Sequence, residues 1–439
     1  MFLKSKKLLL ASALLVLSSC SGNKDLPQGK RISVLDMPAS ELAASKSASK
    51  SFSLSEKQTL KEWNQTFANA VHAPKNISAS TNMVERWSSN FGKGANKRNL
   101  LLASPVASNG VVFVQDVEGS VSAYQLSDGK KLFKQKLKPL NKNDSSSALN
   151  GAGLALDAKK VYALTGFGSV FALDRSSGKI LWRKDLNIPL RTAPTVDQNK
   201  LFVQTIDNQL FCLDTSDGSE IWVYNISAEE TVLAGGAAPA YDASKQIVVA
   251  AFSNGEIQAF NAQIGYPLWS NNLISTGSFT SVLPINAVKA SPVIDSNVVY
   301  AIGNNNQMIA ANLETGEIIW QKQIGGTSTP LVDKEAVFLV SNNMELTAMD
   351  KANGNPLWQQ PLLSNLENKE RRELYVSAPL LINSELLLVT SSGLVLTFDP
   401  KTGKQKNVLD LGESLPFAPI AVDKNIIFVT NDAELIVYQ

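Results

Sequence analysis

The chain is short of several residue types on which common chemistries depend. Among its 439 residues, histidine occurs once, at His72, and cysteine twice, at Cys20 and Cys212. A single histidine argues against a histidine-based catalytic triad and against a histidine-rich metal centre. No stretch reaches the ~20 consecutive apolar residues that a membrane-spanning helix needs. The composition therefore weighs against these classes of enzyme and against a helical membrane protein.

A strong excess of charge is also missing. Lysine and arginine together number 41, aspartate and glutamate 39, and three of the lysines lie in the first seven residues. No basic groove interleaved with aromatic residues is visible, so nucleic acid is not an expected partner. A phosphate-binding loop is absent as well, because Gly235-Gly236 and Gly325-Gly326 are isolated pairs before strands, which is a weak signal.

What the chain does contain is an eleven-residue motif that recurs seven times. In a clear copy, the small residue Ala172 precedes Asp174, Gly178 follows four positions later, and Trp182 comes after four more. The carboxylate can accept hydrogen bonds within a tight turn, and glycine adopts a positive φ at little cost. A tryptophan at a fixed place suits packing between adjacent sheets. The motif glycines, spaced roughly 40 to 50 residues apart as in stacked β units, are Gly129, Gly178, Gly218, Gly265, Gly316, Gly354 and Gly403.

Each motif predicts the last two strands of a four-stranded unit. Two further strand-like segments precede it, usually opening with a small residue and proline and continuing as a β-branched or aromatic run. The aromatic position is Phe133 in the first copy, whereas the last copy has Asn407 there. Four strands are the content of one propeller blade. Repetition also marks these residues as structural, so Cys212, at a small strand position, is expected in the core.

Counting the units predicts a closed ring. Eight units open, but the eighth begins at Ala418-Pro419 and stops at Gln439 before its last strand. The missing strand is supplied by the segment around Trp87, near the other end of the chain. We therefore expect an all-β, eight-bladed β-propeller over residues 82–439, closed by an N-terminal strand.

The residues before the ring predict a leader and a tether. Residues 1–19 have a basic start, a short apolar core and small residues at the end, which is typical of a signal peptide. Leu17-Ser-Ser-Cys20 resembles the bacterial lipobox, and this resemblance implies cleavage before Cys20 and lipidation of that residue. The alternative is an ordinary signal peptide in which Cys20 is incidental. Ser21, in place of aspartate, resembles the pattern that sends lipoproteins to the outer membrane.

Residues 20–81 are predicted to form the lipidated tether, with a helix over residues 55–72. Leu60, Trp63, Phe67 and Val71 would form one apolar stripe on that helix, and Pro74 would end it. The helix either docks on the propeller or binds a partner. His72 is placed at its end, outside the ring. No catalytic, cofactor or metal-binding constellation emerges from the sequence, so a binding or scaffold protein is expected rather than an enzyme.

The Ala-x-Asp-x-x-Thr-Gly-x-x-x-Trp motif resembles the repeat of pyrroloquinoline quinone (PQQ) dehydrogenase propellers. That superfamily includes a non-enzymatic branch, the BamB family of lipoproteins of the outer-membrane β-barrel assembly (BAM) machinery. The chain resembles this branch through its lipobox, its tether, its eight units and the closing strand with Trp87. The quinone dehydrogenases usually carry adjacent cysteines, which this chain lacks. The alternative is a PQQ-dependent dehydrogenase, or a ligand-binding propeller derived from one.

The resemblance also implies partners. Ile188, Leu190 and Arg191 lie in a segment that resembles the loop by which the family docks on the periplasmic POTRA domains of BamA, and two apolar anchors with a guanidinium suit an interface. From the residues alone, a Leu190 that packs inward is an equally open interpretation. The family's acidic pair is missing from the comparable segment 285–289.

The function implied by the resemblance is that of a lipid-anchored scaffold on the periplasmic side of the outer membrane. Such a scaffold binds BamA and other BAM subunits, contacts unfolded outer-membrane proteins and aids the folding and insertion of β-barrels. It needs no cofactor.

Overall fold

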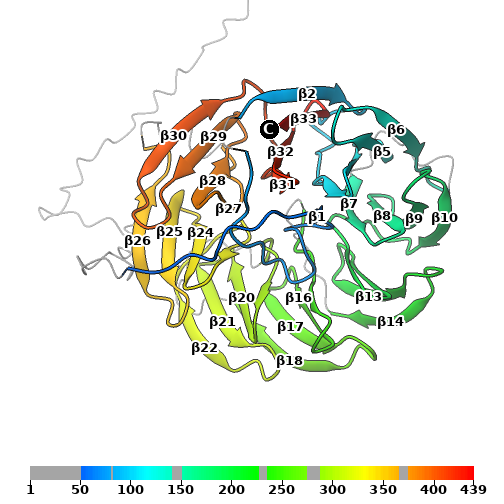
Figure 1. The fold of residues 1–439 in the computed structure, drawn as a ribbon. Helices are drawn as coiled ribbons and strands as arrows, with labels where there is room; N and C mark the ends of the chain where they lie inside the picture. The colour runs from blue at the N-terminus through cyan, green and yellow to red at the C-terminus, as the bar shows by residue number, and fades with distance from the viewer. Residues whose placement is uncertain (1–50, 81–82, 141–150, 227–234, 274–286, 365–373) are drawn as a thin grey trace, which may run out of the picture. The chain divides into compact units, whose positions relative to one another are not determined.

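Eight small β-sheets form a ring around a central axis (Figure 1). The computed structural model describes residues 51–80, 83–140, 151–226, 235–273, 287–364 and 374–439. In each blade four antiparallel strands run in order from the axis to the rim, and the first sheet gains a fifth short strand, β1 (Glu62–Trp63), next to its innermost strand. The expected all-β, eight-bladed propeller is confirmed.

The first four blades follow one another along the chain. Blade 1 contains β3 (Val106–Ser108), β4 (Val111–Gln115), β5 (Ser120–Gln125) and β6 (Lys131–Lys136). Blade 2 contains β7 (Gly151–Leu156), β8 (Lys160–Thr165), β9 (Ser169–Asp174) and β10 (Ile180–Asp185). Blade 3 contains β11 (Thr195–Asp197), β12 (Lys200–Gln204), β13 (Gln209–Asp214) and β14 (Glu220–Asn225). Blade 4 contains β15 (Ala240–Asp242), β16 (Ile247–Ala251), β17 (Glu256–Asn261) and β18 (Pro267–Asn272).

The remaining blades complete the circle. Blade 5 contains β19 (Val293–Asp295), β20 (Val298–Gly303), β21 (Gln307–Asn312) and β22 (Ile318–Lys322). Blade 6 contains β23 (Leu331–Val332), β24 (Ala336–Val340), β25 (Glu345–Asp350) and β26 (Pro356–Pro361). Blade 7 contains β27 (Leu380–Ile382), β28 (Glu385–Val389), β29 (Leu394–Phe398) and β30 (Gln405–Asp410). Blade 8 contains β31 (Ile420–Val422), β32 (Asn425–Val429), β33 (Glu434–Tyr438) and, from the start of the ring, β2 (Glu85–Asn90).

Blade 8 closes the ring as the sequence predicts. Strand β2 pairs antiparallel with β33, and Trp87 lies opposite Val437. Since the first and last strands of the ring belong to one sheet, neither end of the propeller leaves an unpaired edge. The two middle strands of every blade are almost fully buried, while the outer strands alternate or are exposed. The core therefore lies between the blades.

The repeated turn has the geometry that its residues suggest. In blade 2, Asp174 Oδ1 accepts hydrogen bonds from the backbone N–H groups of Ser176 (3.2 Å) and Ser177 (2.8 Å), and Gly178 has a φ of 72°. Hydrogen bonds from the hydroxyl groups of Ser176 and Ser177 lower the pKa of Asp174 to about 2. The repeated acidic residue thus serves the turn.

The repeated tryptophan joins each blade to the next one. Trp182 of blade 2 donates from Nε1 to the carbonyl oxygen of Thr215 in blade 3 (3.0 Å), and its ring covers Gly218. A Cβ atom at Gly218 would lie 2.7 Å from that ring, so the glycine is required by its neighbour as well as by its positive φ of 76°. The equivalent donors are Trp87, Trp222, Trp269, Trp320 and Trp358.

This contact explains why the last motif lacks its tryptophan. Blade 7 precedes blade 8, in which β33 and β2 come from different ends of the ring and no turn connects them. Blade 8 consequently has no turn glycine for a tryptophan to cover. Asn407 stands in blade 7 at the position where a tryptophan would have no partner.

The predicted helix over residues 55–72 is wrong. The described part of the chain contains no helix, and this stretch instead forms part of an extended crossing segment, residues 51–80, that runs over the middle of the ring (Figure 1). Phe67 and Ala68 have φ values of 54° and 72°, which a right-handed helix does not allow. Trp63 is nonetheless buried, so the apolar pattern reported burial rather than helical periodicity.

The crossing segment contacts every blade. At blade 1, β1 pairs with β3, with Trp63 opposite Ala107. Backbone and side-chain groups of the blades, together with short turns within the segment, partner its polar groups in place of an internal helical ladder. Hydrogen bonds to blades 2 to 8 include those from Leu156 N to Asn64 O (2.6 Å), Gln65 Nε2 to Val196 O (3.1 Å), Tyr241 N to Ala70 O (2.7 Å), Ile294 N to Val71 O (2.9 Å), Ser55 N to Asp333 Oδ2 (2.8 Å), Ile77 N to Leu381 O (2.9 Å) and Ser80 N to Lys424 O (2.8 Å).

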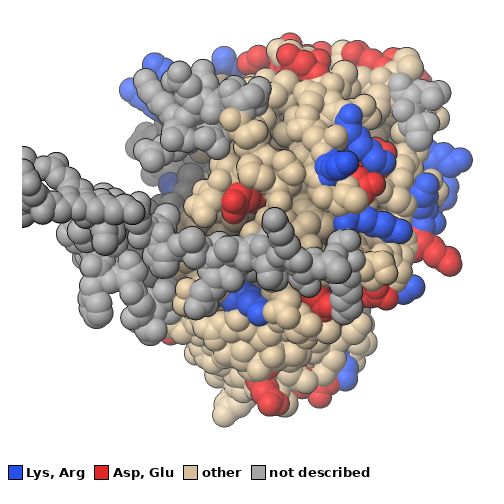
Figure 2. Space-filling view, turned by 90° about the vertical axis from the view of Figure 1, so that its left-hand side faces the viewer, with Lys and Arg blue, Asp and Glu red and all other residues tan. Residues whose placement is uncertain are grey.

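The surface mixes charges of both signs. On the side of the molecule shown in Figure 2, lysine and arginine side chains are interspersed with aspartate and glutamate among mostly uncharged residues. No helix within the described ranges is long and apolar enough to cross a membrane. The predicted signal peptide and Cys20 lie outside the described residues.

Candidate functional site

The ring has two faces of different construction. Because the strands of each blade are antiparallel, the turns between its first and second strands and between its third and fourth strands lie on one face, together with the crossing segment. We call this the turn face. The other face, here the loop face, carries the connections between blades, among them residues 186–194 between blades 2 and 3.

The three predicted partner-binding residues lie on the loop face but differ in exposure. Leu190 is fully buried between blades 2 and 3 and forms an isolated antiparallel bridge with Thr205. Its side chain therefore packs inward, as the second interpretation of this segment expected. Ile188 is half-buried and its backbone lies against Gly168, where a Cβ atom would be 2.6 Å from the Ile188 carbonyl oxygen. Arg191 is half-buried and lines two cavities. Partner binding by this loop stays a prediction.

The larger of these cavities, about 430 Å³, occupies the central channel of the ring. Trp63, Thr66 and Phe67 of the crossing segment line it from the turn face. Arg191 and Lys289 line it from the loop-face connections. The described residues around the cavity include no carboxylate, so its charged lining is entirely positive.

Lys289 is a further cation of the site, and no motif in the sequence points to it. Its Nζ atom lies 5.7 Å from the centre of the Tyr375 ring, within the range of a cation–π contact. Burial lowers the pKa of Lys289 and raises the pKa of Tyr375. The segment that contains Lys289 is the one in which the family's acidic pair is missing. The structure brings it to the same cavities as Arg191.

The glycine pair Gly235-Gly236 allows these side chains to approach. Gly235 has a φ of 84°, and a Cβ atom there would lie 3.4 Å from Lys289 Cε. A Cβ atom at Gly236 would lie 2.5 Å from Thr192 Cγ2, which is closer than van der Waals contact permits. The signal that could have led to Lys289 is therefore this glycine pair, which local sequence patterns left unexplained.

A calcium-bound quinone does not fit the described lining of the channel. Calcium prefers six to eight oxygen ligands with carboxylates among them, and the described residues around this cavity include none. Within the described ranges, no three His, Cys, Asp or Glu side chains group as metal ligands. Cys212 is fully buried in the core between blades 3 and 4, and burial raises its pKa to about 12, which makes it an unreactive thiol.

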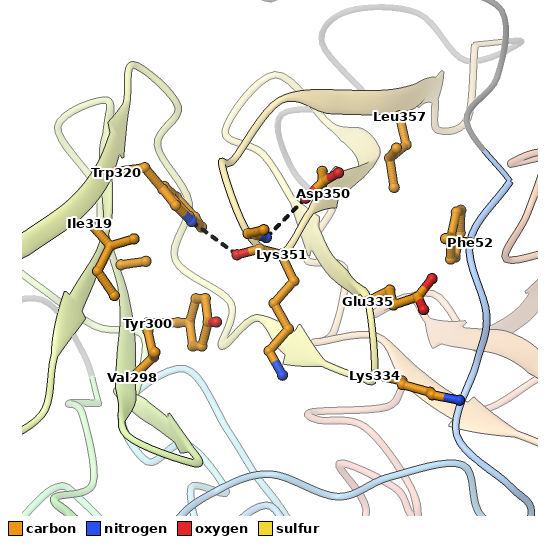
Figure 3. Close-up of a pocket in the computed structure, with 12 residues that line it drawn as sticks. Phe52, Val298, Tyr300, Ile319, Trp320, Lys334, Glu335, Asp350, Lys351 and Leu357 are labelled. Carbon is orange, nitrogen blue, oxygen red and sulfur yellow. Dashed lines mark hydrogen bonds between the residues drawn. The ribbon is translucent and has the colours of Figure 1, made fainter.

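A second cavity of about 450 Å³ lies at the seam between blades 5 and 6 (Figure 3). Its lining includes Trp320, which donates to the Lys351 carbonyl oxygen at 3.0 Å, and Phe52 of the crossing segment. The Lys351 ammonium group pairs with Asp295 of blade 5. These contacts are of the kind that recurs between adjacent blades. The cavity is therefore a gap in the packing of blades 5 and 6, and we assign it no separate function.

Together, these features define a propeller of PQQ-type repeats whose repeated positions are structural and whose channel is covered on one side by the crossing segment. The family model described as "Outer membrane protein assembly factor BamB" matches residues 117–360 and 345–439. The chain belongs to the BamB family.

Individual relatives agree with this assignment. Outer membrane protein assembly factor BamB of Moranella endobia is 28% identical over 240 residues, which are 54% of this chain and 60% of the relative. The namesake from Yersinia pestis is 27% identical over 244 residues, covering 55% and 61%. The chain thus spans about 60% of the length of these relatives.

Solved structures support the fold alone. The crystal structure of BamB from Moraxella catarrhalis superposes with a TM-score of 0.67 at 17% identity, covering 81% of this chain and 99% of that one. A europium-containing methanol dehydrogenase gives a TM-score of 0.68 at 14% identity, covering 84% and 89%. The same ring therefore occurs both in assembly factors and in dehydrogenases, and the fold does not decide between them.

Proposed function

We propose that the chain is a non-enzymatic scaffold of the outer-membrane protein assembly machinery, which binds the periplasmic POTRA domains of BamA and aids the folding and insertion of β-barrel proteins. Membership of the BamB family over residues 117–360 and 345–439 carries this proposal. Among the described residues the channel is lined by cations and by no carboxylate, which supports a scaffold over a quinone dehydrogenase. Other BAM subunits and unfolded outer-membrane proteins complete the proposed set of partners.

The proposal includes an anchor. Cleavage before Cys20 and lipidation of that residue would hold the protein on the periplasmic side of the outer membrane. Growth with a radiolabelled fatty acid should label the protein, and Cys20→Ala should abolish the label. If the wild-type protein is not labelled, the proposed anchor is refuted, whereas the assignment of the propeller is unaffected.

Capture of BamA from detergent-solubilised membranes tests the central claim. The tagged, full-length protein should retain BamA, and the double variant Ile188→Ala with Arg191→Ala should retain at least tenfold less. A matched control is Lys179→Ala with Ile264→Ala, which removes the same two kinds of side chain from the turn face, where Ile264 is 69% exposed. Failure of the wild-type protein to retain BamA would overturn the proposed function. Equal retention by both double variants would refute the loop as the binding site.

Leu190 needs separate treatment because it is fully buried. Leu190→Ala would leave a cavity between blades 2 and 3, so any loss of BamA could follow from a disturbed ring. Its unfolding transition must be measured beside its BamA capture.

A further inference from the structure

The central channel is a pocket with one closed end. Trp63, which is 2% exposed, and Phe67 border it at the turn face, where the crossing segment is hydrogen-bonded to every blade. Arg191 and Lys289 border it toward the loop face. We propose that this channel binds a small organic anion whose carboxylate or phosphate group is held by Arg191 and Lys289.

The first support for this site is the lack of counter-ions. Within the described part of the chain, Lys289 forms no ion pair, and its one charge-related contact is the face of the Tyr375 ring at 5.7 Å. Arg191 likewise has no acidic partner among the described residues. The Lys289 ammonium group is the cation that burial disfavours, and an anionic group that enters the cavity beside it would relieve that cost.

The second support is the way in which the pocket accommodates its cations. Gly236 leaves room for Thr192, the neighbour of Arg191, and the Lys289 stem passes within van der Waals range of Gly235. Any side chain at Gly236 would collide with Thr192. Two blade connections that are distant in the sequence are thus brought together at one end of the channel. A guanidinium and an ammonium lining one cavity are a recurring arrangement for carboxylate and phosphate.

The remaining lining suits a small organic molecule. Hydroxyl side chains around the cavity offer neutral hydrogen-bonding groups beside the cations, and Leu380, Leu415 and Phe417 offer an apolar surface. A volume of about 430 Å³ lies in the range of small-molecule pockets. Toward the loop face the hydroxyl residues include Thr192, Ser291, Thr327, Ser328, Thr329 and Ser391.

The closed end argues against a polypeptide threaded through the ring. A chain entering from the loop face would meet Trp63 and Phe67, and displacing them would break the pairing of β1 with β3. A small anion needs no such rearrangement. The site therefore favours a soluble ligand over an extended acidic peptide, and it stands independently of the proposed binding of BamA.

Isothermal titration calorimetry on the purified protein at low ionic strength tests the site. Citrate and inorganic phosphate serve as the carboxylate and phosphate probes, malonamide as an uncharged control, and a short polyglutamate peptide as the polypeptide competitor. At least one of the two anions should bind with saturable heat at up to millimolar concentration, and malonamide should not. Lys289→Met, which keeps an apolar stem against Tyr375, and Arg191→Gln should each weaken binding at least tenfold.

The matched control is Lys179→Gln, which removes a cation from an exposed turn outside the channel and should leave the affinity unchanged. Far-ultraviolet circular dichroism and thermal unfolding verify that each variant is folded. Absence of heat with both anions would overturn the proposal, as would equal affinities of Lys289→Met and Lys179→Gln. Binding of the peptide without binding of citrate or phosphate would also overturn it. Because BamA is absent from the experiment, these outcomes are separate from those of the capture assay.

Discussion

The two faces of the ring differ in how their polar groups are paired. On the turn face, the crossing segment supplies hydrogen-bond partners to all eight blades, and Lys75 pairs with Asp295 at 2.7 Å. On the loop face, Arg191 and Lys289 line a cavity without any carboxylate among the described residues. Paired groups stabilise a fold, whereas unpaired charges at a cavity are available to a ligand or partner. The difference is local to the channel, because elsewhere on the loop face charges are paired, as Arg183 is with Asp185 at 2.6 Å. It teaches that the crossing segment serves stability, whereas the loop-face end of the channel offers charge without a counter-ion among the described residues.

The largest expected effect is on the turn face, at Trp63. This side chain is 2% exposed and belongs to the hydrophobic core that surrounds the closure of the ring. Trp63→Ala should lower the free energy of unfolding by about 3–5 kcal/mol, because a large cavity is left behind. Chemical denaturation monitored by circular dichroism measures it. Val408→Ala, at a position that is 50% exposed, is the control and should cost under about 0.5 kcal/mol. A cost below 1 kcal/mol at Trp63 would mean that the segment is not integral to the fold.

The turn face should also be sensitive to acid, through His72. This side chain is buried against blade 5, where Nδ1 donates to the Pro292 carbonyl oxygen at 2.9 Å and Nε2 has no partner among the described residues. Burial lowers the pKa of His72 to about 4 from 6.5. The unfolded chain therefore binds the proton first, and stability that is complete above pH 6.5 is lost as the pH falls to 4. The loss approaches about 3 kcal/mol.

Denaturation of the wild-type protein and of His72→Gln between pH 7 and pH 4.5 measures this effect. The glutamine amide can still donate to Pro292 but does not titrate in this range. The wild-type protein should lose more stability than the variant over the interval. Parallel losses would assign the acid sensitivity to other groups.

A smaller effect is expected at the seams between blades. Gly316 has a φ of 73°, and a Cβ atom there would lie 2.6 Å from the Trp269 ring. Gly412 has a nearly identical φ of 69° with no atom within 4 Å of the same position. Gly316→Ala should cost about 2–3 kcal/mol and Gly412→Ala about 1 kcal/mol, because both pay for the left-handed backbone but only the first meets the tryptophan. Equal midpoints in thermal denaturation would show that the tryptophan yields without strain.

The smallest effect on stability is expected on the loop face. Arg191→Gln removes a half-buried charge that has no acidic partner among the described residues, so the free energy of unfolding should change by less than about 0.5 kcal/mol. Urea denaturation checks this. A loss above 1 kcal/mol would show that Arg191 stabilises the fold. The contrast between the stabilising crossing segment and the channel cations would then not hold.

The sequence predicts the ring well because its determinants are local and repeated. Asp174, Gly178 and Trp182 each carry out a structural task within one turn or one seam, and the sevenfold repetition of their motif makes that task visible. The incomplete eighth unit and Trp87 predicted the closure correctly. The helix over residues 55–72 failed for the opposite reason. Its polar groups are partnered by several different blades and by short local turns, and no pattern within the segment encodes those partners.

The candidate site was only partly visible for a similar reason. Arg191 stood out through a local motif, and it does line the channel. Leu190 satisfied the same motif but is buried, since the connection between blades 2 and 3 forms a single bridge from Leu190 to Thr205 and turns its side chain into the core. Lys289 lies about a hundred residues further along the chain, and only the circular arrangement brings it to the cavity that Arg191 lines.

The crossing segment also sets an order of events during folding. Residues 51–80 are made early, yet their partners include Lys424 and Asp423 in the last blade. Docking must therefore wait until nearly the whole chain is available, and so must the pairing of β2 with β33. Contacts over such long sequence separations form slowly because the intervening chain must first be ordered. The start of the propeller is thus its final piece, and an incomplete chain would leave Trp63 and Trp87 without the surfaces that bury them.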